Sequence, residues 1–176
     1  RIRKCQLEAS LDRRAMTWTC AWLAQKLGNQ ADFIRDLKKH RSQHHDYLHE
    51  KIERIDALRL AILALDAPRL DETAAGTLHG LEGTAGRLYF ETLSFVLPAP
   101  WQFAGRSSRP AQDVFNAFLN YAYGVLYARV EKSLMLAGLD PYVGFLHRDD
   151  YNYKSLVYDF IEPYRAWADK VVFTLF

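Results

Sequence analysis

The chain has 176 residues, of which 49% are hydrophobic and 25% are charged, as in an ordinary soluble globular protein. This length fits one domain whose folding buries roughly 70% of the unfolded surface. No run approaches 18 consecutive apolar residues, so we expect no membrane span, and the first ten residues lack the apolar core of an export signal. Cys5 and Cys20 are therefore expected to be free thiols in a reducing cytosol.

Charge is distributed unevenly along the chain. Residues 1–54 hold 12 Lys and Arg against 7 Asp and Glu (+5), and the remaining residues hold 11 against 14 (−3), which gives the net charge of +2. A basic region beside an acidic one suits a protein that grips phosphates with one part and holds a cation with another. An ordinary solvated surface has the same distribution, so charge leaves both interpretations open.

The first third of the chain has the apolar spacing of amphipathic helices. The pattern predicts a helix over residues 11–27 that Gly28 and Asn29 end, and a short basic helix over residues 30–40. Another helix is predicted over residues 46–65. The histidines near these segments lack a Cys or an acid at zinc-site spacing, so we interpret them as part of a polar helix face. They are His40, His44, His45 and His49.

The next predicted helix, roughly residues 72–97, places an acid within its apolar stripe. Glu82 lies four residues after Leu78 and three before Ala85, which both belong to that stripe. Burying a carboxylate costs several kcal/mol unless a cation or a hydrogen-bond donor meets it. From these residues alone, Glu82 either pairs with an arginine such as Arg87 or Arg129, or it binds a metal ion.

A turn-rich loop follows, with Arg106 and Arg109 on either side of two serines. Such a loop is typical of phosphate binding, and equally of a surface connection. The long helix predicted over residues 113–137 is apolar around most of its circumference, so we expect it to be packed on several sides. Asn116 and Asn120 are unusual polar points on it, which either bridge to neighbouring elements or face DNA.

The last part of the chain combines a turn signal at residues 138–141 with a lone histidine, His147. A helix is predicted from about residue 155 to residue 169, and it carries Asp159 and Glu162 one turn apart. Their spacing places both acids opposite the apolar face. Bare periodicity therefore favours a solvated surface.

Pro163 lies beyond the first turn of this helix, so the helix is expected to start late or to kink there. A kink beside the acids fits a shaped site better than a plain surface. A Glu162–Arg165 pair is the expected ion pair if the face is solvated.

Five sequence blocks occur in order and together resemble one protein family. They are KLGNQ (26–30), LEGTAGRLYF (81–90), RSSRPAQDVFNAFLNYAYGVL (106–126), GLDPYVGFLH (138–147) and SLVYDFIEPYR (155–165). The set resembles the helical C-terminal domain of CRISPR-associated protein one, the spacer-acquisition integrase. The resemblance covers nearly the whole chain, and its last three blocks are specific as a set.

The resemblance implies an all-α fold, an irregular multi-helix bundle, in which residues 1–176 form one helical catalytic domain. Relative to the family this domain is expected to be truncated at both ends, without the N-terminal β-rich domain. The implied activity is that of a metal-dependent DNA integrase or endonuclease, which inserts spacers into CRISPR arrays by 3′-hydroxyl attack on a repeat phosphodiester. A non-catalytic DNA-binding scaffold and a transposon-borne integrase relative are the alternatives.

The resemblance also implies the site residues. The family's metal ligands match Glu82, His147 and Glu162, its additional active-site acid matches Asp159, and the metal is Mg²⁺ or Mn²⁺. These ligands and Asp159 form the expected catalytic set. Candidates for positioning the DNA backbone are the loop residues and a basic run after residue 35. They are Arg106, Arg109, Asn116, Lys38, Lys39 and Arg41.

The implied partners are DNA, as prespacer and CRISPR repeat, a second copy of the chain, and the small ferredoxin-like second core adaptation protein. An upstream fusion partner is a further expectation, because the chain begins abruptly. The expected location is the prokaryotic cytoplasm, with no membrane association.

Overall fold

The computed structural model describes residues 1–147 and 153–176, and within these residues it contains helices and no β-strand. The predicted all-α class is confirmed. None of the described helices is long and apolar enough to cross a lipid bilayer. The helices are α1 (Ile2–Ser10), α2 (Arg13–Lys39), α3 (His45–Leu63), α4 (Glu72–Val96), α5 (Val114–Leu136), α6 (Ser155–Ile161) and α7 (Arg165–Phe173). Short 3₁₀ turns lie at Ser42–His44 (η1), Ala99–Trp101 (η2) and Glu162–Tyr164 (η3).

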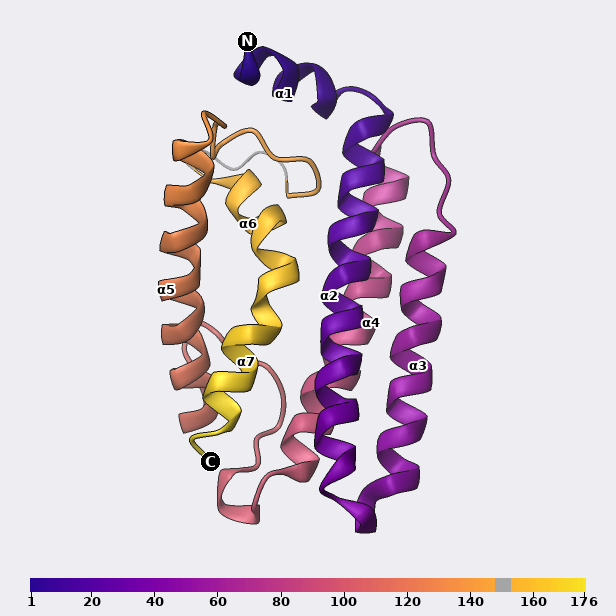
Figure 1. The fold of residues 1–176 in the computed structure, drawn as a ribbon, viewed down its shortest axis with the longest axis vertical. Coiled ribbons are helices and arrows are strands. Elements are labelled where there is room, and N and C mark those ends of the chain that lie inside the picture. Colours follow the sequence, from indigo (N-terminus) through magenta and orange to yellow (C-terminus); the bar gives the residue numbers. More distant parts are fainter. Residues whose placement is uncertain (148–152) are drawn as a thin grey trace.

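The helices form two groups that meet along α2. In Figure 1, α2, α3 and α4 stand together on one side, and α5, α6 and α7 stand on the other. Helix α2 packs against α3 and α4 and also contacts η3 and α7 of the second group. It is therefore the element through which the two groups are aligned.

An aspartate begins each of the long helices α2, α4 and α5. The side chains of Asp12, Asp71 and Asp113 accept a backbone N–H of the first turn at 2.8, 3.0 and 2.7 Å, respectively. Such a cap satisfies a donor that has no partner within the helix and contributes about 1 kcal/mol. The predicted starts near residues 72 and 113 are confirmed.

The predicted stop at Gly28 and Asn29 is wrong, because α2 runs unbroken from Arg13 to Lys39. Glycine inside a helix costs about 1 kcal/mol relative to alanine. Leu27 and Ile34 are fully buried on either side of it, and burying one such side chain gains about 2 kcal/mol. Tertiary packing thus outweighs the local stop signal.

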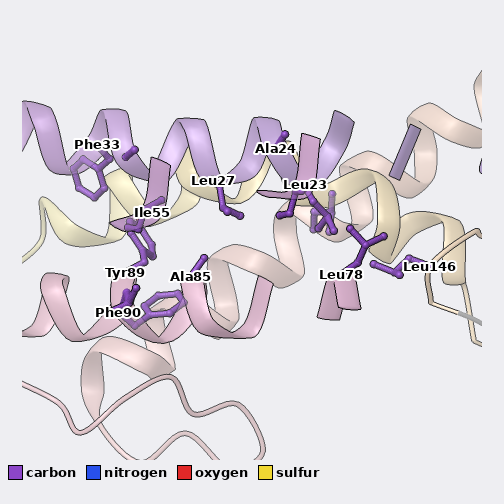
Figure 2. Packing of buried hydrophobic residues seen from close by; sticks show 14 of the residues in the cluster. Leu23, Ala24, Leu27, Phe33, Ile55, Leu78, Ala85, Tyr89, Phe90 and Leu146 are labelled. Atoms are coloured by element: carbon purple, nitrogen blue, oxygen red, sulfur yellow. The ribbon is translucent and has the colours of Figure 1, made fainter. Parts of the chain in front are cut away.

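The core lies between α2, α3 and α4. Figure 2 shows five members of this buried cluster, which are Leu23 and Leu27 of α2, Ile55 of α3, and Leu78 and Ala85 of α4. All five are almost completely buried. The predicted apolar stripe of α4 is therefore the face that packs into this core, and Glu82 lies at its edge, half-buried.

The predicted helix over residues 155–169 bends at Pro163. Helix α6 ends at Ile161, the η3 turn follows, and α7 begins at Arg165. The predicted kink is confirmed. The solvated-face alternative is wrong, because Asp159 and Glu162 are each only 3% exposed. Asp159 lies against the loop residues up to His147, and Glu162 lies against Lys26 of α2, so both acids face the interior of the protein.

Candidate functional site

A lysine of α2 stands between two carboxylates that are far apart in the sequence. Lys26 Nζ contacts Glu82 Oε1 of α4, and it lies 2.5 Å from Glu162 Oε2 of the η3 turn. The side chain of Lys26 is 10% exposed, so the contact is shielded from solvent. Glu82 and Glu162 are therefore within reach of one cation. The partner of Glu82 is this lysine, not one of the two arginines considered from the sequence.

Lys26 and Glu162 hold each other in their charged forms. Burial lowers the pKa of Lys26, but the attraction of Glu162 and Glu82 outweighs burial and raises the pKa above its ordinary value. Burial raises the pKa of Glu162, whereas Lys26 and Arg165 lower it, with a net result of about 2. Glu162 is therefore ionised at neutral pH.

Arg165 supplies a second cation to Glu162. Its Nε and its terminal NH2 each lie 2.9 Å from Glu162 Oε1, which confirms the predicted Glu162–Arg165 pair. The other oxygen, Oε2, is buried and lies 2.5 Å from Lys26 Nζ. Each oxygen of Glu162 therefore faces a cation, Oε1 facing Arg165 and Oε2 facing Lys26.

Asp159 fixes the position of His147. Its Oδ2 accepts the backbone N–H groups of Phe145 and Leu146 at 2.6 and 3.1 Å. Its Oδ1 accepts the backbone N–H of His147 at 3.1 Å and lies 2.7 Å from the ring Nδ1. Because Nδ1 is engaged, Nε2 is the ring nitrogen left to bind a cation or a substrate.

The pKa of His147 is raised above its ordinary value. Burial lowers it, but the hydrogen bond and charge of Asp159, together with the charges of Glu162 and Glu82, have a larger opposite effect. The imidazole therefore lies in a field set by three carboxylates. Such a field attracts a cation.

The three predicted metal ligands line one cavity of about 600 Å³. Among residues 1–147 and 153–176, no three His, Cys, Asp or Glu side chains are close enough to hold a metal ion as they stand. Lys26 occupies the space between the two glutamates instead. Two carboxylates with one imidazole are a donor set that suits Mg²⁺ or Mn²⁺, and the position of Lys26 shows that one cation can lie between the two carboxylates.

Sequence reasoning missed Lys26, which lines this cavity, and His79, which lies next to Glu82 and His147. Lys26 lies in an ordinary helical pattern, so only its position opposite Glu82 and Glu162 distinguishes it. His79 lies one turn before Glu82, with Nδ1 3.9 Å from Glu82 Oε2 and its ring centroid 5.7 Å from that of His147. An i, i+3 His–Glu pair on one helix face was a signal available in the sequence.

Asn116 and Asn120 bridge the loop to α5. Arg106 donates to Asn116 Oδ1 at 3.0 Å and to Asn120 Oδ1 at 2.6 Å, while Asn116 Nδ2 donates to the carbonyl of Gly105 at 2.9 Å. Asn116 is fully buried. Of the two alternatives for these asparagines, bridging between elements is the one that the contacts show, and burial keeps the Asn116 side chain away from the surface.

A second cavity, of about 700 Å³, adjoins the first, and the two share Arg106, Tyr123 and Arg165 as lining residues. The guanidinium carbons of Arg106 and Arg165 lie 5.3 and 4.8 Å from the centroid of the Tyr123 ring. Arg109 is exposed and lines this second cavity. The wall between the cavities is therefore a tyrosine flanked by two cations.

The remaining candidate DNA contacts lie elsewhere. Lys38 and Lys39 are at the end of α2, and Arg41 lies beyond it, with its guanidinium 5.5 Å from the ring of Phe173. Lys38 is 12 residues beyond Lys26, or about 18 Å along the helix. The structure brings Glu82, Glu162 and His147 to one cavity, but it does not bring this basic run there.

A buried acid lies behind the tyrosine wall. Asp169 is fully buried and accepts hydrogen bonds from the hydroxyls of Tyr89 and Tyr123 at 2.9 and 2.5 Å. Burial raises the pKa of Asp169, and the two tyrosine hydrogen bonds lower it, with a net result of about 6. This acid holds the ring of Tyr123 in its place between the arginines.

The fold and these side chains together define an all-helical domain with an acidic, cation-lined cavity. A family model described as "CRISPR associated protein Cas1" matches residues 1–176. The CRISPR-associated endonuclease Cas1 1 of Archaeoglobus fulgidus is 34% identical over 99% of this chain and 54% of the relative. The CRISPR-associated endonuclease Cas1 3 of Thermus thermophilus is 42% identical over 66% of this chain and 35% of the relative. The chain therefore belongs to the Cas1 family.

Solved structures agree with this assignment. A chain of the structure entitled "Partial Cas6-RT-Cas1--Cas2 complex" superposes with a TM-score of 0.83 and 25% identity, over 97% of this chain and 48% of the other. A casposase bound to its integration product superposes with a TM-score of 0.74, over 98% of this chain and 46% of the other, but at 23% identity this likeness concerns the fold alone. The chain spans about half the length of the first relative it matches.

Proposed function

We propose that this chain is the catalytic part of a metal-dependent DNA integrase that joins new spacers to CRISPR arrays. The observation that carries the proposal is the meeting of Glu82 and Glu162 on one cation, with His147 at the same cavity. The names of its relatives as endonucleases fit this activity. Water in place of the DNA hydroxyl would give strand cleavage from the same geometry.

The ligand residues would be Glu82, Glu162 and His147, which suit Mg²⁺ or Mn²⁺. When bound, such an ion polarises a phosphate oxygen and lowers the pKa of an attacking hydroxyl. Asp159 would keep the imidazole oriented through Nδ1, so that Nε2 faces the cavity. Because one phosphodiester replaces another, the reaction needs no nucleotide cofactor.

The cations around the cavity would bind the reacting phosphate. Arg165 is fixed by its pair with Glu162, and Arg106 by its bonds to two asparagines, so neither guanidinium has to be ordered when DNA arrives. Preorganised donors of this kind stabilise charge that develops on phosphate oxygens. Lys26, once released from the glutamates, would add a third positive charge.

The second cavity would hold the DNA strand that leads to the reacting phosphate. Tyr153 and Tyr158 stack at its lining, with centroids 4.3 Å apart, and Arg109 lies at the same cavity. Aromatic rings next to arginines bind unpaired bases and backbone without requiring a particular sequence. This arrangement supports DNA as the substrate.

Partners are proposed from the relatives. Two of the solved structures that this chain resembles are titled as complexes that contain Cas1 with Cas2, and both titles also name Cas6 and RT. We infer a second copy of this chain, prespacer and repeat DNA, and the small second core adaptation protein as partners, with an upstream fusion as a further arrangement. Each applies to the whole protein rather than to residues 1–176 alone.

The test is strand transfer by the full-length protein carrying Glu82→Gln. This variant keeps the size of the side chain but removes its charge, so we expect at least a hundredfold loss of Mn²⁺-dependent joining of a labelled 3′-hydroxyl DNA end to repeat DNA. Glu53→Gln, an exposed position of α3, is the control and should retain wild-type joining. Unchanged joining by Glu82→Gln would refute the proposal, and DNA binding without metal-dependent joining by the wild type would favour a scaffold.

A further inference from the structure

The side-chain amide of a buried glutamine in α1 forms hydrogen bonds with the backbone of one loop through both its nitrogen and its oxygen. Gln6 is 5% exposed, and its Nε2 donates to the carbonyl oxygens of Asp140 and Val143, each at 2.8 Å. Its Oε1 accepts the backbone N–H of Asp140 at 2.9 Å. The amide therefore binds residues 134 and 137 positions away in the sequence. These contacts link the first helix to the loop that ends at His147.

The same loop is fastened on its other side by α6. Ser155 Oγ accepts the N–H of Gly144 at 2.9 Å and donates to the carbonyl of Tyr142 at 2.8 Å. A Cβ on Gly144 would lie 2.7 Å from atoms of Ser155, so the two segments touch closely there. Further along the loop, Asp159 accepts hydrogen bonds from the backbone N–H groups of Leu146 and His147. The loop is thus held between α6 on one side and Gln6 on the other.

Helix α1 makes little apolar contact that would explain its position. Gln6 and Ala9 are the buried residues of its nine, while Ile2 and Leu7 are about half exposed. Hydrophobic burial is the usual reason for a helix to dock. Here a polar clamp on residues 140–143 takes the central place instead.

The inner side of the loop is packed at Phe145 but borders a cavity next to Gln6. A largely apolar cavity of about 440 Å³ lies between Gln6, Phe145 and α2, where Trp18 and Trp22 face the Phe145 ring at centroid distances of 5.5 and 5.8 Å. Close packing normally holds a loop from within. The aromatic contacts hold Phe145, whereas Asp140 and Val143, at the start of the loop, are held by the hydrogen bonds of Gln6.

We propose that Gln6 is a positioning residue for His147. It fixes the start of the loop so that Asp159 meets the imidazole at the geometry observed. The consequence for metal binding rests on the proposed function. The consequence for the loop does not, because it follows from the hydrogen bonds alone.

The first measurement needs no metal. In Gln6→Leu, which keeps the bulk and loses all three hydrogen bonds, we expect the backbone amides of Phe145, Leu146 and His147 to exchange with solvent at least tenfold faster. Amides in the middle of α4 should be unaffected. Gln6→Glu retains the oxygen that accepts the N–H of Asp140, so its loop amides should exchange faster than in the wild type but more slowly than in Gln6→Leu. This variant provides the test if Gln6→Leu does not fold.

The second measurement is the Mn²⁺ affinity of the full-length protein by calorimetry, where a displaced imidazole should weaken binding about tenfold. Leu48→Ala, in the α3 core, is the control for lost stability, and Lys4→Ala, on the exposed side of α1, is the control for the helix. If Leu48→Ala, compared at the same distance below its melting temperature, matches Gln6→Leu in loop exchange and Mn²⁺ affinity, the positioning role is refuted. Absence of Mn²⁺ binding to the wild type would refute the proposed function and leave the loop result to decide on Gln6.

Discussion

Lys26 Nζ lies 2.5 Å from Oε2 of Glu162, and the same ammonium also contacts Glu82. A buried cation shared by two carboxylates shows that α2, α4 and the η3 turn are built to place two negative charges at one point. Two carboxylates close enough to contact the same ammonium repel each other unless a positive charge lies between them. The site therefore has to contain a cation between the two glutamates.

The first prediction concerns Lys26→Met. Removing one partner of a buried ion pair leaves the others uncompensated, at a cost of about 3–5 kcal/mol, so the metal-free variant should melt well below the wild type. Mn²⁺ should stabilise the variant more than the wild type, because it would meet both glutamates without displacing an ammonium. Thermal unfolding with and without Mn²⁺ measures both effects.

The matched control for this variant is Arg35→Met, which breaks the partly exposed pair with Asp56. It should lose about 1 kcal/mol or less and gain no extra stabilisation from Mn²⁺. A Lys26→Met protein that melts at the same temperature with and without the ion would contradict a shared cation site.

The second prediction concerns Asp159→Asn. In the wild type, Asp159 accepts hydrogen bonds from backbone N–H groups of the loop. The amide of Asn replaces one of these acceptor oxygens with an NH₂ donor, so that two donors face each other. We expect a loss of about 2–3 kcal/mol in unfolding free energy from unsatisfied buried donors, and weaker Mn²⁺ binding by about tenfold to a hundredfold. Urea unfolding and calorimetry check these values. A variant with wild-type Mn²⁺ affinity would show that Asp159 does not orient His147.

The third prediction is a pH dependence that Asp169 controls. Its pKa of about 6 in the folded protein exceeds the ordinary 3.8, so the folded state keeps a proton that the unfolded state has lost. Stability should therefore fall as pH rises from 5 to 7, by on the order of 1 kcal/mol relative to Asp169→Asn. Glu162, with its pKa lowered to about 2, has the opposite effect, but that effect lies below about pH 4.5.

Denaturant titrations of the wild type and Asp169→Asn at pH 5, 6 and 7 give the comparison. His147 titrates in both proteins, so its contribution cancels in the difference. Parallel stability profiles across this range would be inconsistent with a raised pKa at Asp169.

The fourth prediction separates two arginines. Arg109 is exposed at the second cavity. Arg109→Ala should therefore reduce the slope of log K for DNA binding against log salt concentration by about 0.7, the value for one lost contact with a single-strand phosphate, without loss of stability. Arg106→Ala should also weaken DNA binding, but together with thermal stability, since Arg106 organises the loop through Asn116 and Asn120. Binding isotherms at several salt concentrations and melting curves distinguish the two. Equal salt slopes for the wild type and Arg109→Ala would remove Arg109 from the DNA surface.

The sequence was sufficient for most helices because their signals are local. Apolar residues three or four positions apart predicted α4, and a long, mostly apolar run after Asp113 predicted α5. Pro163 predicted the bend between α6 and α7. Helix α1 was not predicted, since its buried residues Gln6 and Ala9 make no apolar stripe. Its docking depends on a loop more than 130 residues away, which no local pattern encodes.

The site was predictable in part. Glu82 was conspicuous as an acid in an apolar stripe, but periodicity alone placed Asp159 and Glu162 on a solvated face. The loop up to His147 covers Asp159, and α2 covers Glu162, and neither contact is local in the sequence. Lys26 could not be identified at all, because its significance is a distance to two residues on other elements. Family resemblance supplied the set of residues, and the structure supplied the cation between them.

Asn29, once expected to end a helix, instead donates its side-chain N–H to the carbonyl of Pro163 at 2.7 Å. It lies three residues after Lys26, so one face of α2 contacts both the acid and the proline of the same turn. A residue inserted into α2 between these two would rotate one contact by about 100° relative to the other. The spacing of Lys26 and Asn29 on α2 thus fixes the position of the η3 turn, and through it the position of α6 and α7, relative to α2.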